Sequence, residues 1–431
     1  MNELERYPLH RAAFFNDVRT LESLIVAGAD LYEKDIHGNT ALHICTMLGH
    51  KESIALLLVH NAPVKAKNSG GWSSLMEAVA YGDREIITTI LRKLKSQARE
   101  NLVLRKPHLF KVLNDIGDFY LELRWDFHSW IPLLSRVLPS DICKIYKRGT
   151  ALRMDTTLVD FNERTWERGD ISFIYNPAAE SVNQHLVVLD NKSKVFQRIR
   201  NQETDVELDE EVDVLMSSDI VSASMSTKPI TFERAFSGWI FKHEKSEQIG
   251  NFEANYYAVE GMSLVTRKRR EHLSMDDIKK NKTFMQNFTT GKTGLQHRKS
   301  LPPPGRTSTT WEEYVGAPPG FPPPLGRPQV LKTHAKVFKA MLAMSEEFPL
   351  EVSVLLDILE IVAPFKHFEK LRRFCEVRLP PGFPVRVEVP LLPTISAKVT
   401  FQRFEWRDDL TTKFFRIPKS YREDATRFPD L

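Results

Sequence analysis

Cysteine is scarce in this sequence, with only Cys45, Cys143 and Cys375 among 431 residues. These three lie far apart and no Cys-x-x-Cys pair occurs, which excludes a disulfide framework and a thiolate zinc site. A reducing compartment is the natural setting for such a chain. We expect each cysteine to be a small buried apolar residue rather than a reactive thiol.

Long hydrophobic runs and an excess of one charge are also missing. No stretch of about 18 uncharged apolar residues occurs, which argues against a membrane-spanning helix. The charged N-terminus MNELERYPLHRAAFFND lacks the apolar core of a signal peptide. The 60 basic and 56 acidic residues leave a formal net charge of +4, without the concentrated basic face of a nucleic-acid binder. We therefore expect no nucleic-acid partner.

Catalytic motifs are absent as well. The sequence has no H-E-x-x-H, G-x-S-x-G or G-x-G-x-x-G pattern. The fragment GKT at 291–293 lacks the phosphate-loop glycine, because Gln286 stands five residues before Gly291. We predict a non-enzymatic protein without catalytic residues, cofactor or metal, while a site assembled from distant residues stays open at this point.

What the sequence does contain is an internal repeat of 33 residues within its first hundred. The segments PLHRA, ALHIC and SLMEA recur at this spacing, and both the period and the pattern are those of ankyrin repeats. Small residues let the paired helices approach closely, and larger apolar residues fill the space between units. The aligned sets are Leu9, Leu42 and Leu75; Ala12, Cys45 and Ala78; and Leu24, Leu57 and Ile90.

Two polar features of the repeats have local explanations. Gly28 and Asn61 occupy equivalent helix ends, where a positive φ is expected. His10 and His43 stand at the repeat turns, where we expect them to hydrogen-bond to the backbone rather than to act as ligands or bases.

A helix from Leu109 to Leu123 is predicted next, because apolar residues recur at three- and four-residue spacing. We expect this helix to cover the open face of the third repeat. The acidic run ELDEEVD (207–213) is interpreted as a solvated edge or loop. RKRR (267–270) resembles a nuclear signal, but a charged strand-to-helix junction is favoured.

The remaining residues predict a mixed domain. Short alternating segments at 171–175, 186–190, 194–199, 238–241 and 255–267 are typical of antiparallel strands. Residues 336–348, 350–363 and 366–377 are expected to form three helices, and 385–392 and 398–404 two further strands. Residues 276–330 are rich in proline and glycine and predict a mobile linker, within which WEEY (311–314) is a candidate tethering anchor.

The predicted fold class is therefore α+β, an N-terminal ankyrin-repeat α-solenoid followed by a mixed antiparallel-β and helical domain. Residues 1–100 would hold about three repeats. Residues 101–275 would form the first part of the larger domain, 276–330 the linker, and 331–431 the C-terminal part of that domain.

Candidate protein-binding positions follow from how ankyrin stacks work. Hairpin tips and inner helices are left free for partners, since other positions are used in stacking. Trp72 is either a binding hot spot at a tip or a side chain packed under the turn. The candidates are Phe14, Ile36, His37, Asn39, Met47, Trp72 and Tyr81.

Long segments beyond the repeats resemble the ankyrin repeat domain 13 family. They include WDFHSWIPLLSRVLPSDICKIYKRGTALRMDTTLVDF, RGDISFIY, EEVDVLMSSDI, TWEEY and LPPGFPVRVEVPLLPTISAKVTFQ. The likeness covers almost the whole chain from Tyr7 to RFPDL. One branch of that family carries ubiquitin-interacting motifs and works in endocytosis. This chain has no acidic helix with Ala-x-x-x-Ser after RFPDL, so it resembles the other, C-type branch.

The resemblance implies a peripheral chaperone for newly made G-protein-coupled receptors at the cytosolic face of the endoplasmic reticulum membrane. The partners expected are receptor cytosolic tails and that membrane surface, and the protein is expected to be monomeric. The alternatives are a ubiquitin-linked endocytic adaptor and a lipid-binding protein that uses the aromatic segment Trp125–Leu134.

Overall fold

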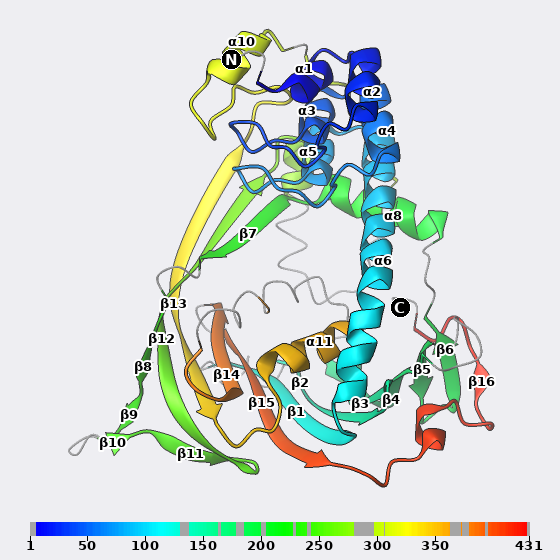
Figure 1. Ribbon diagram of the computed structural model, residues 1–431, viewed down its shortest axis with the longest axis vertical. Coiled ribbons are helices and arrows are strands. Elements are labelled where there is room, and N and C mark those ends of the chain that lie inside the picture. Colours follow the sequence, from blue (N-terminus) through cyan, green and yellow to red (C-terminus); the bar gives the residue numbers. More distant parts are fainter. Residues whose placement is uncertain are drawn as a thin grey trace. The chain divides into compact units, whose positions relative to one another are not determined.

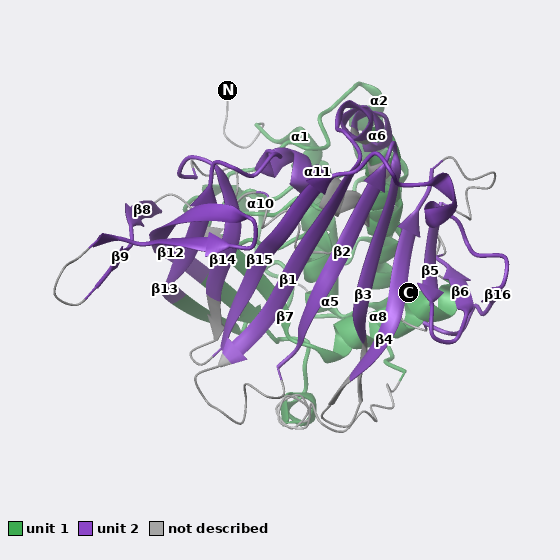
Figure 2. Cartoon of the chain, turned by 90° about the horizontal axis from the view of Figure 1, so that it is seen from below, with its two compact units in different colours: residues 1–104, 203–224, 265–335 green, residues 105–202, 225–264, 336–431 purple. Residues whose placement is uncertain are grey.

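The chain folds into two compact units. The computed structural model describes residues 6–129, 138–162, 165–177, 185–199, 204–226, 230–238, 243–279, 297–305, 307–362, 372, 379–392 and 395–428. The first unit comprises 1–104, 203–224 and 265–335, and the second 105–202, 225–264 and 336–431 (Figure 2). The α+β class is confirmed. The predicted domain limits do not coincide with these units, because each unit is built from three separate stretches of chain.

The first unit contains the three predicted repeats as helical hairpins. Their first helices are α1 (Pro8–Phe14), α3 (Ala41–Leu48) and α5 (Ser74–Tyr81), and their second helices are α2 (Val18–Val26), α4 (Lys51–Val59) and the start of α6 (Arg84–Asp115). The first helices lie side by side in an inner row (Figure 1). The small residues Ala12, Cys45 and Ala78 are buried between the helices, as the period predicts.

The local polar features of the repeats are confirmed. Gly28 and Asn61 have φ values of +89° and +64°. His10 donates from Nε2 to the Asn39 carbonyl (3.0 Å), and His43 from Nε2 to the Trp72 carbonyl (3.1 Å). Both imidazoles therefore tie one repeat to the turn of the next.

The acidic run at 207–213 lies in a helix, so its interpretation as an edge or loop is wrong. Helix α8 (Asp205–Ser217) starts with a capping box in which Glu207 donates its N–H to the Thr204 hydroxyl. Its apolar side packs into the core of the repeats, while its acids pair with the basic face of α6, as in Lys95–Glu211 (2.7 Å). Residues four positions apart lie on the same face of a helix, so Leu208, Val212 and Met216 form one buried stripe, which the string of acids between them concealed.

The predicted helix 109–123 is also only partly right. Helix α6 continues to Asp115, and strand β1 (Phe119–Ser129) then begins. Leu113 packs with the strands of the second unit, so this segment does not cover the third repeat. Instead, Ile87 and Ile90 of α6 and Val212 of α8 share the hydrophobic core of the repeats.

The second unit is built on a curved, mainly antiparallel sheet (Figure 2). Its strand order is β11-β12-β13-β14-β15-β1-β2-β3-β4-β5-β6-β16, and β8 pairs with β12. The strands are β2 (Ser140–Arg148), β3 (Ala151–Asn162), β4 (Thr165–Tyr175), β5 (Leu186–Asp190), β6 (Val195–Arg198), β8 (Thr231–Arg234), β11 (Ser246–Ile249), β12 (Phe252–Arg269), β13 (Leu331–Ser345), β14 (Phe383–Leu392), β15 (Ile395–Trp406) and β16 (Arg422–Glu423).

The described residues also form several smaller elements. They are β7 (Ile220–Ser226), the pair β9 (Phe236–Ser237) and β10 (His243–Glu244), α10 (Trp311–Gly316), α11 (Val352–Val362) and a 3-10 turn (Thr412–Phe415). Leu355 of α11 and Leu113 of α6 share a hydrophobic core with the sheet residues Phe119, Leu121 and Phe383.

The strands predicted at 171–175, 186–190, 194–199, 255–267, 385–392 and 398–404 are confirmed. Residues 239–241 of another predicted strand lie outside the described residues, as does most of the predicted helix 366–377. The helix predicted at 350–363 is confirmed as α11. The helix predicted at 336–348 is wrong, because these residues form β13. Ala340, Leu342 and Met344 are buried together there, at the two-residue period of a strand.

Candidate functional site

The predicted linker is packed on the repeats over its described part. Arg298 donates its backbone N–H to Asp213 (2.8 Å), and its guanidinium contacts Asp277. Burial opposes ionisation of Asp277, but the hydrogen bonds from Arg298 and Ser274 win and lower the pKa of this carboxyl to about 2. Further along, the Leu301 N–H donates to the Gly82 carbonyl (2.8 Å).

The linker prediction is therefore wrong for residues 297–305 and 307–330, which belong to the first unit. Residues 280–296 and Arg306 lie outside the described residues. Proline and glycine disfavour regular helix or strand on either side of residues 311–316, but side chains can still pack from irregular backbone.

The middle of this segment forms α10, which inserts Tyr314 into the tip of the first repeat hairpin. The Tyr314 hydroxyl donates to Asp35 Oδ2 (2.6 Å) and accepts from Asn39 Nδ2 (2.8 Å). His37 Nε2 donates to the Tyr314 carbonyl (2.8 Å). Tyr314 is fully buried (0% exposed). Burial, and then the Asp35 carboxylate, raises the pKa of this phenol, so the hydroxyl stays protonated and available as a donor.

Trp311 provides the second aromatic anchor of α10. It is 1% exposed and packs edge-on against Phe14 of α1, with ring centroids 5.5 Å apart. Its ring also stacks on that of Tyr314 (5.7 Å). We call Phe14, Asp35, His37 and Asn39 the first-repeat socket. The predicted anchoring role of WEEY is confirmed by this arrangement.

The local sequence explains why α10 is a helix at all. In T-W-E-E, the Glu313 N–H donates to the Thr310 hydroxyl (3.2 Å), and the Thr310 N–H donates to Glu313 Oε2 (2.9 Å). This reciprocal capping box satisfies orphan donors at the start of the helix. Pro318 follows just beyond Gly316 and cannot continue it.

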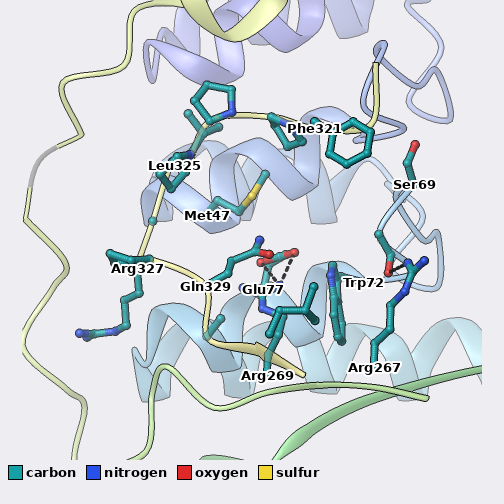
Figure 3. A pocket seen from close by; sticks show the side chains of 18 of the residues that line it. Met47, Ser69, Trp72, Glu77, Arg267, Arg269, Phe321, Leu325, Arg327 and Gln329 are labelled. Atoms are coloured by element: carbon teal, nitrogen blue, oxygen red, sulfur yellow. Dashed lines mark hydrogen bonds and ion pairs between the residues drawn. The ribbon is translucent and has the colours of Figure 1, made fainter. Parts of the chain in front are cut away.

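Beyond α10, the proline-rich residues 320–329 pass over the inner helices and enclose a cavity of about 680 Å³ (Figure 3). Met47 and Trp72 line the side of the repeats, and Leu325 belongs to the proline-rich side. Arg327 ties this segment down by donating to the Tyr81 carbonyl (3.1 Å). Phe321 is 78% exposed at the mouth. We call this space the inner-face cavity.

One wall of the cavity holds a buried charge cluster at the end of β12. Arg269 Nη1 contacts both carboxylate oxygens of Glu77 at 2.9 Å, and Arg269 Nη2 contacts Glu271 Oε1 at 2.5 Å. The guanidinium carbon lies 5.0 Å from the centre of the Trp72 ring. The adjacent Arg267 donates to the Gly70 carbonyl (2.7 Å). The RKRR run is thus a strand end whose Arg267 and Arg269 hold the repeats, which agrees with the favoured interpretation as a charged junction.

The seven predicted binding residues divide between the two features. Phe14, His37 and Asn39 belong to the first-repeat socket, and Ile36 is half-buried beside it against the core of the repeats. Met47, Trp72 and Tyr81 line the inner-face cavity.

Trp72 is 3% exposed, and its ring packs beneath the turn with Arg269. Trp72 was predicted to be either a binding hot spot at a tip or a side chain packed under the turn, and the packed arrangement is the one observed. The sequence reasoning did not select Tyr314 and Trp311 as residues that fill the socket, although the T-x-x-E capping box around them was a usable signal.

The described residues also bear on metal binding, membrane spanning and the state of the cysteines. No three His, Cys, Asp or Glu side chains are grouped there in a way that could hold a metal ion. No helix in the described part of the chain is long and apolar enough to cross a membrane. Cys45 and Cys143 are buried as expected, and burial raises the pKa of the Cys143 thiol to about 11. Cys375 lies outside the described residues.

Comparison with known proteins agrees with this architecture. Residues 9–101 match the family model for ankyrin repeats (3 copies), and residues 153–428 match the one described as ANKRD13 C-terminal. The chain is 54% identical to human ankyrin repeat domain-containing protein 13C over 431 residues, which is 99% of this chain and 79% of that protein.

Two further relatives show the same similarity over most of the chain. The protein of the same name from Danio rerio is 53% identical over 434 residues, covering 99% of this chain and 88% of its own length. Human ankyrin repeat domain-containing protein 13B is 34% identical over 433 residues, or 94% of this chain and 68% of that protein. With matches that span both the repeats and the larger domain, the chain belongs to the ankyrin repeat domain-containing protein 13 family.

Proposed function

We propose that this protein is a non-enzymatic adaptor that binds other proteins, and that its clients are cytosolic segments of newly made G-protein-coupled receptors. It would act as a monomer at the cytosolic face of the endoplasmic reticulum membrane. The observation that carries the adaptor role is the ankyrin stack, whose inner helices line an open cavity. The receptors and the membrane come from the resemblance to the family.

The inner-face cavity has the properties of a peptide site. Its volume of about 680 Å³ falls within the range of roughly 300–1,000 Å³ that is usual for ligand pockets. Met47 and Trp72 offer apolar surface, while Arg267 and Arg327 contribute positive charge at its edges. Among the described residues, neither arginine has an ion-pair partner. A client segment with an apolar side chain next to a carboxylate matches this lining.

A matched pair of substitutions tests this assignment. Met47→Arg would fill the cavity with a long cation, whereas Val59→Arg adds the same group on α4, where Val59 is 77% exposed. Binding of fluorescent receptor-tail peptides to the purified full chain would be measured by polarisation. We expect at least a tenfold loss of affinity for Met47→Arg and no change for Val59→Arg.

The outcomes separate the candidate functions. Equal binding by both variants would remove the cavity from the client site. If wild-type protein ignores receptor tails and captures ubiquitin, the endocytic adaptor is correct. Flotation with liposomes in the absence of any peptide binding would favour the lipid-binding alternative.

A further inference from the structure

We infer that α10 is a built-in ligand and that the first-repeat socket is a docking site for a partner helix of the same kind. The partner that fits is a short capped helix with one aromatic residue at its start and a tyrosine three residues later. In this chain Trp311 and Tyr314 occupy those places, so a partner must displace them.

The hairpin turn of the socket is held by hydrogen bonds that do not involve α10. Asp35 Oδ1 accepts from the backbone N–H groups of His37 and Asn39, both at 2.8 Å, and these two bonds hold the hairpin turn. The second oxygen, Oδ2, is free of that task and accepts from Tyr314 (2.6 Å).

Asn39 divides its groups in the same way. Its Oδ1 accepts from Asn68 Nδ2 of the next hairpin (2.9 Å), and its Nδ2 donates to the Tyr314 hydroxyl (2.8 Å). Asp35 and Asn39 therefore each use one atom to build the repeats and direct another at the phenol of Tyr314. Any partner that replaces α10 must satisfy this second set of atoms.

α10 is joined to the rest of the chain by proline-rich segments on both sides, which would allow it to be displaced as a unit. Its capping box is internal to residues 310–313, so the helix satisfies its own first turn. Pro302–Pro304 precede it and Pro318, Pro319 and Pro322–Pro324 follow it. Proline has no N–H to donate, so these flanks form no continuous hydrogen-bonded strand on the repeats and are held at separate points, by Leu301 N–H on the Gly82 carbonyl and by Arg327 on the Tyr81 carbonyl. An added Cβ would meet nothing within 4 Å at Gly305 or at Gly316, so the backbone there is uncrowded.

The buried groups that α10 contacts define the chemistry of a partner. Both aromatic rings of α10 are almost completely buried, and the socket would be left with an unpaired carboxylate oxygen and amide if they departed alone. Leaving buried polar groups unpaired is unfavourable. A competitor must therefore supply a phenol hydroxyl as well as apolar area, which phenylalanine in place of tyrosine cannot do.

This inference rests on the proposed function only in treating the repeats as a protein-binding surface. It can be tested with a labelled peptide of residues 307–317, TSTTWEEYVGA. The full chain carrying Trp311→Ala and Tyr314→Ala has an emptied socket. We expect the peptide to bind this variant at least tenfold more tightly than wild type, because the wild-type socket is already filled.

Two variant peptides test whether binding depends on the tyrosine hydroxyl. A peptide with Tyr314→Phe should lose at least fivefold in affinity, whereas one with Glu312→Gln should bind unchanged, since Glu312 is exposed. Equal binding to wild type and to the emptied variant would place the peptide elsewhere. Absence of binding to an emptied variant with native circular dichroism would overturn the inference.

A measurement on the wild-type chain covers the case in which the variant does not fold. We expect the amides of residues 311–316 to exchange hydrogen faster than those of α3 and α5. Exchange at the same rate as those helices would mean that α10 leaves only on unfolding, which also overturns the inference. The result is independent of receptor-tail binding to the cavity, so the two proposals can fail separately.

Discussion

Removing Arg269 should destabilise the repeats more than removing its buried partner Glu77 or its sequence neighbour Lys268. Its side chain and those of Glu77 and Glu271 are each 2% exposed. The guanidinium is the group through which both carboxylates are neutralised, and it also packs on Trp72. Three substitutions test this cluster. Arg269→Ala and Glu77→Ala remove members of it, and Lys268→Ala is the control beside it.

The expected magnitudes follow from what each change leaves behind. Arg269→Ala leaves two buried carboxylates without their cation, which costs about 3–5 kcal/mol of unfolding free energy. Glu77→Ala removes two charge-assisted hydrogen bonds but leaves Arg269 paired with Glu271, so a loss of about 2–3 kcal/mol is expected. Lys268 has no carboxylate partner in the described part of the chain, and its removal should change stability by no more than about 0.5 kcal/mol.

Urea unfolding of the full chain, followed by circular dichroism, would rank the three variants. Hydrogen exchange of α5 would show that the loss lies in the repeats. A loss of about 3 kcal/mol raises the unfolded fraction more than a hundredfold. Should Arg269→Ala and Lys268→Ala prove equally stable, the cluster does not hold the repeats, and the RKRR run would be a solvated charge patch after all.

Two further predictions concern pH and backbone conformation. Burial lowers the pKa of His43 to about 4, so between that value and about 6.5 the unfolded chain binds the proton better; stability should fall as pH drops from 7 to 5. His43→Gln should flatten this dependence in thermal melts, and an unchanged slope would contradict it. An alanine Cβ at Gly250 (φ +57°) would lie 1.7 Å from the Gln402 carbonyl oxygen, whereas at Gly149 (φ +53°) it meets nothing. By urea unfolding, Gly250→Ala should cost roughly 3 kcal/mol or more, since backbone must shift, against about 1–2 for Gly149→Ala; equal losses would refute the clash.

The repeats were predictable from the sequence because their contacts are local. Each helix packs on a neighbour one period away, so the residues that touch recur at fixed spacing and leave a pattern. The same holds for β5 and β6, two short apolar runs that follow each other in the chain and pair with each other. A single sequence carries enough information for elements of this kind.

The failures share a different physical cause. Residues 336–345 are rich in alanine, methionine and leucine, which favour helix, but pairing with β14 makes them a strand. Propensities of a few tenths of a kcal/mol per residue are easily outweighed by a full ladder of hydrogen bonds and burial on both faces. The sequence of the segment carries no sign of its partner strand, which lies some forty residues further along the chain.

Of the candidate site, the residues on the repeats were predicted from the sequence, but those on α10 were not. Phe14, His37 and Asn39 were selected as partner-binding positions, and the structure shows that they bind α10 of the same chain. His37 and Tyr314 are separated by 277 residues, and no periodicity connects such a pair. Composition pointed the other way, because proline-rich segments usually fail to pack. The buried pair Trp311 and Tyr314 overrides that tendency through two rings and three hydrogen bonds.

If clients bind the inner face as proposed, its division into a socket filled by α10 and a cavity determines what a client must offer. A tethered segment such as α10 acts at an effective concentration of about 1 mM. A free helix of equal intrinsic affinity, present at about 1 µM, would therefore hold the socket about one thousandth of the time. A client that contacts Met47 and Trp72 in the cavity while it presents a tyrosine to Asp35 can recover this factor of a thousand through the second contact. If both proposals hold, a partner helix that binds the socket alone must bind about a thousandfold more tightly than α10 or be correspondingly more abundant, whereas a client that also fills the cavity need not.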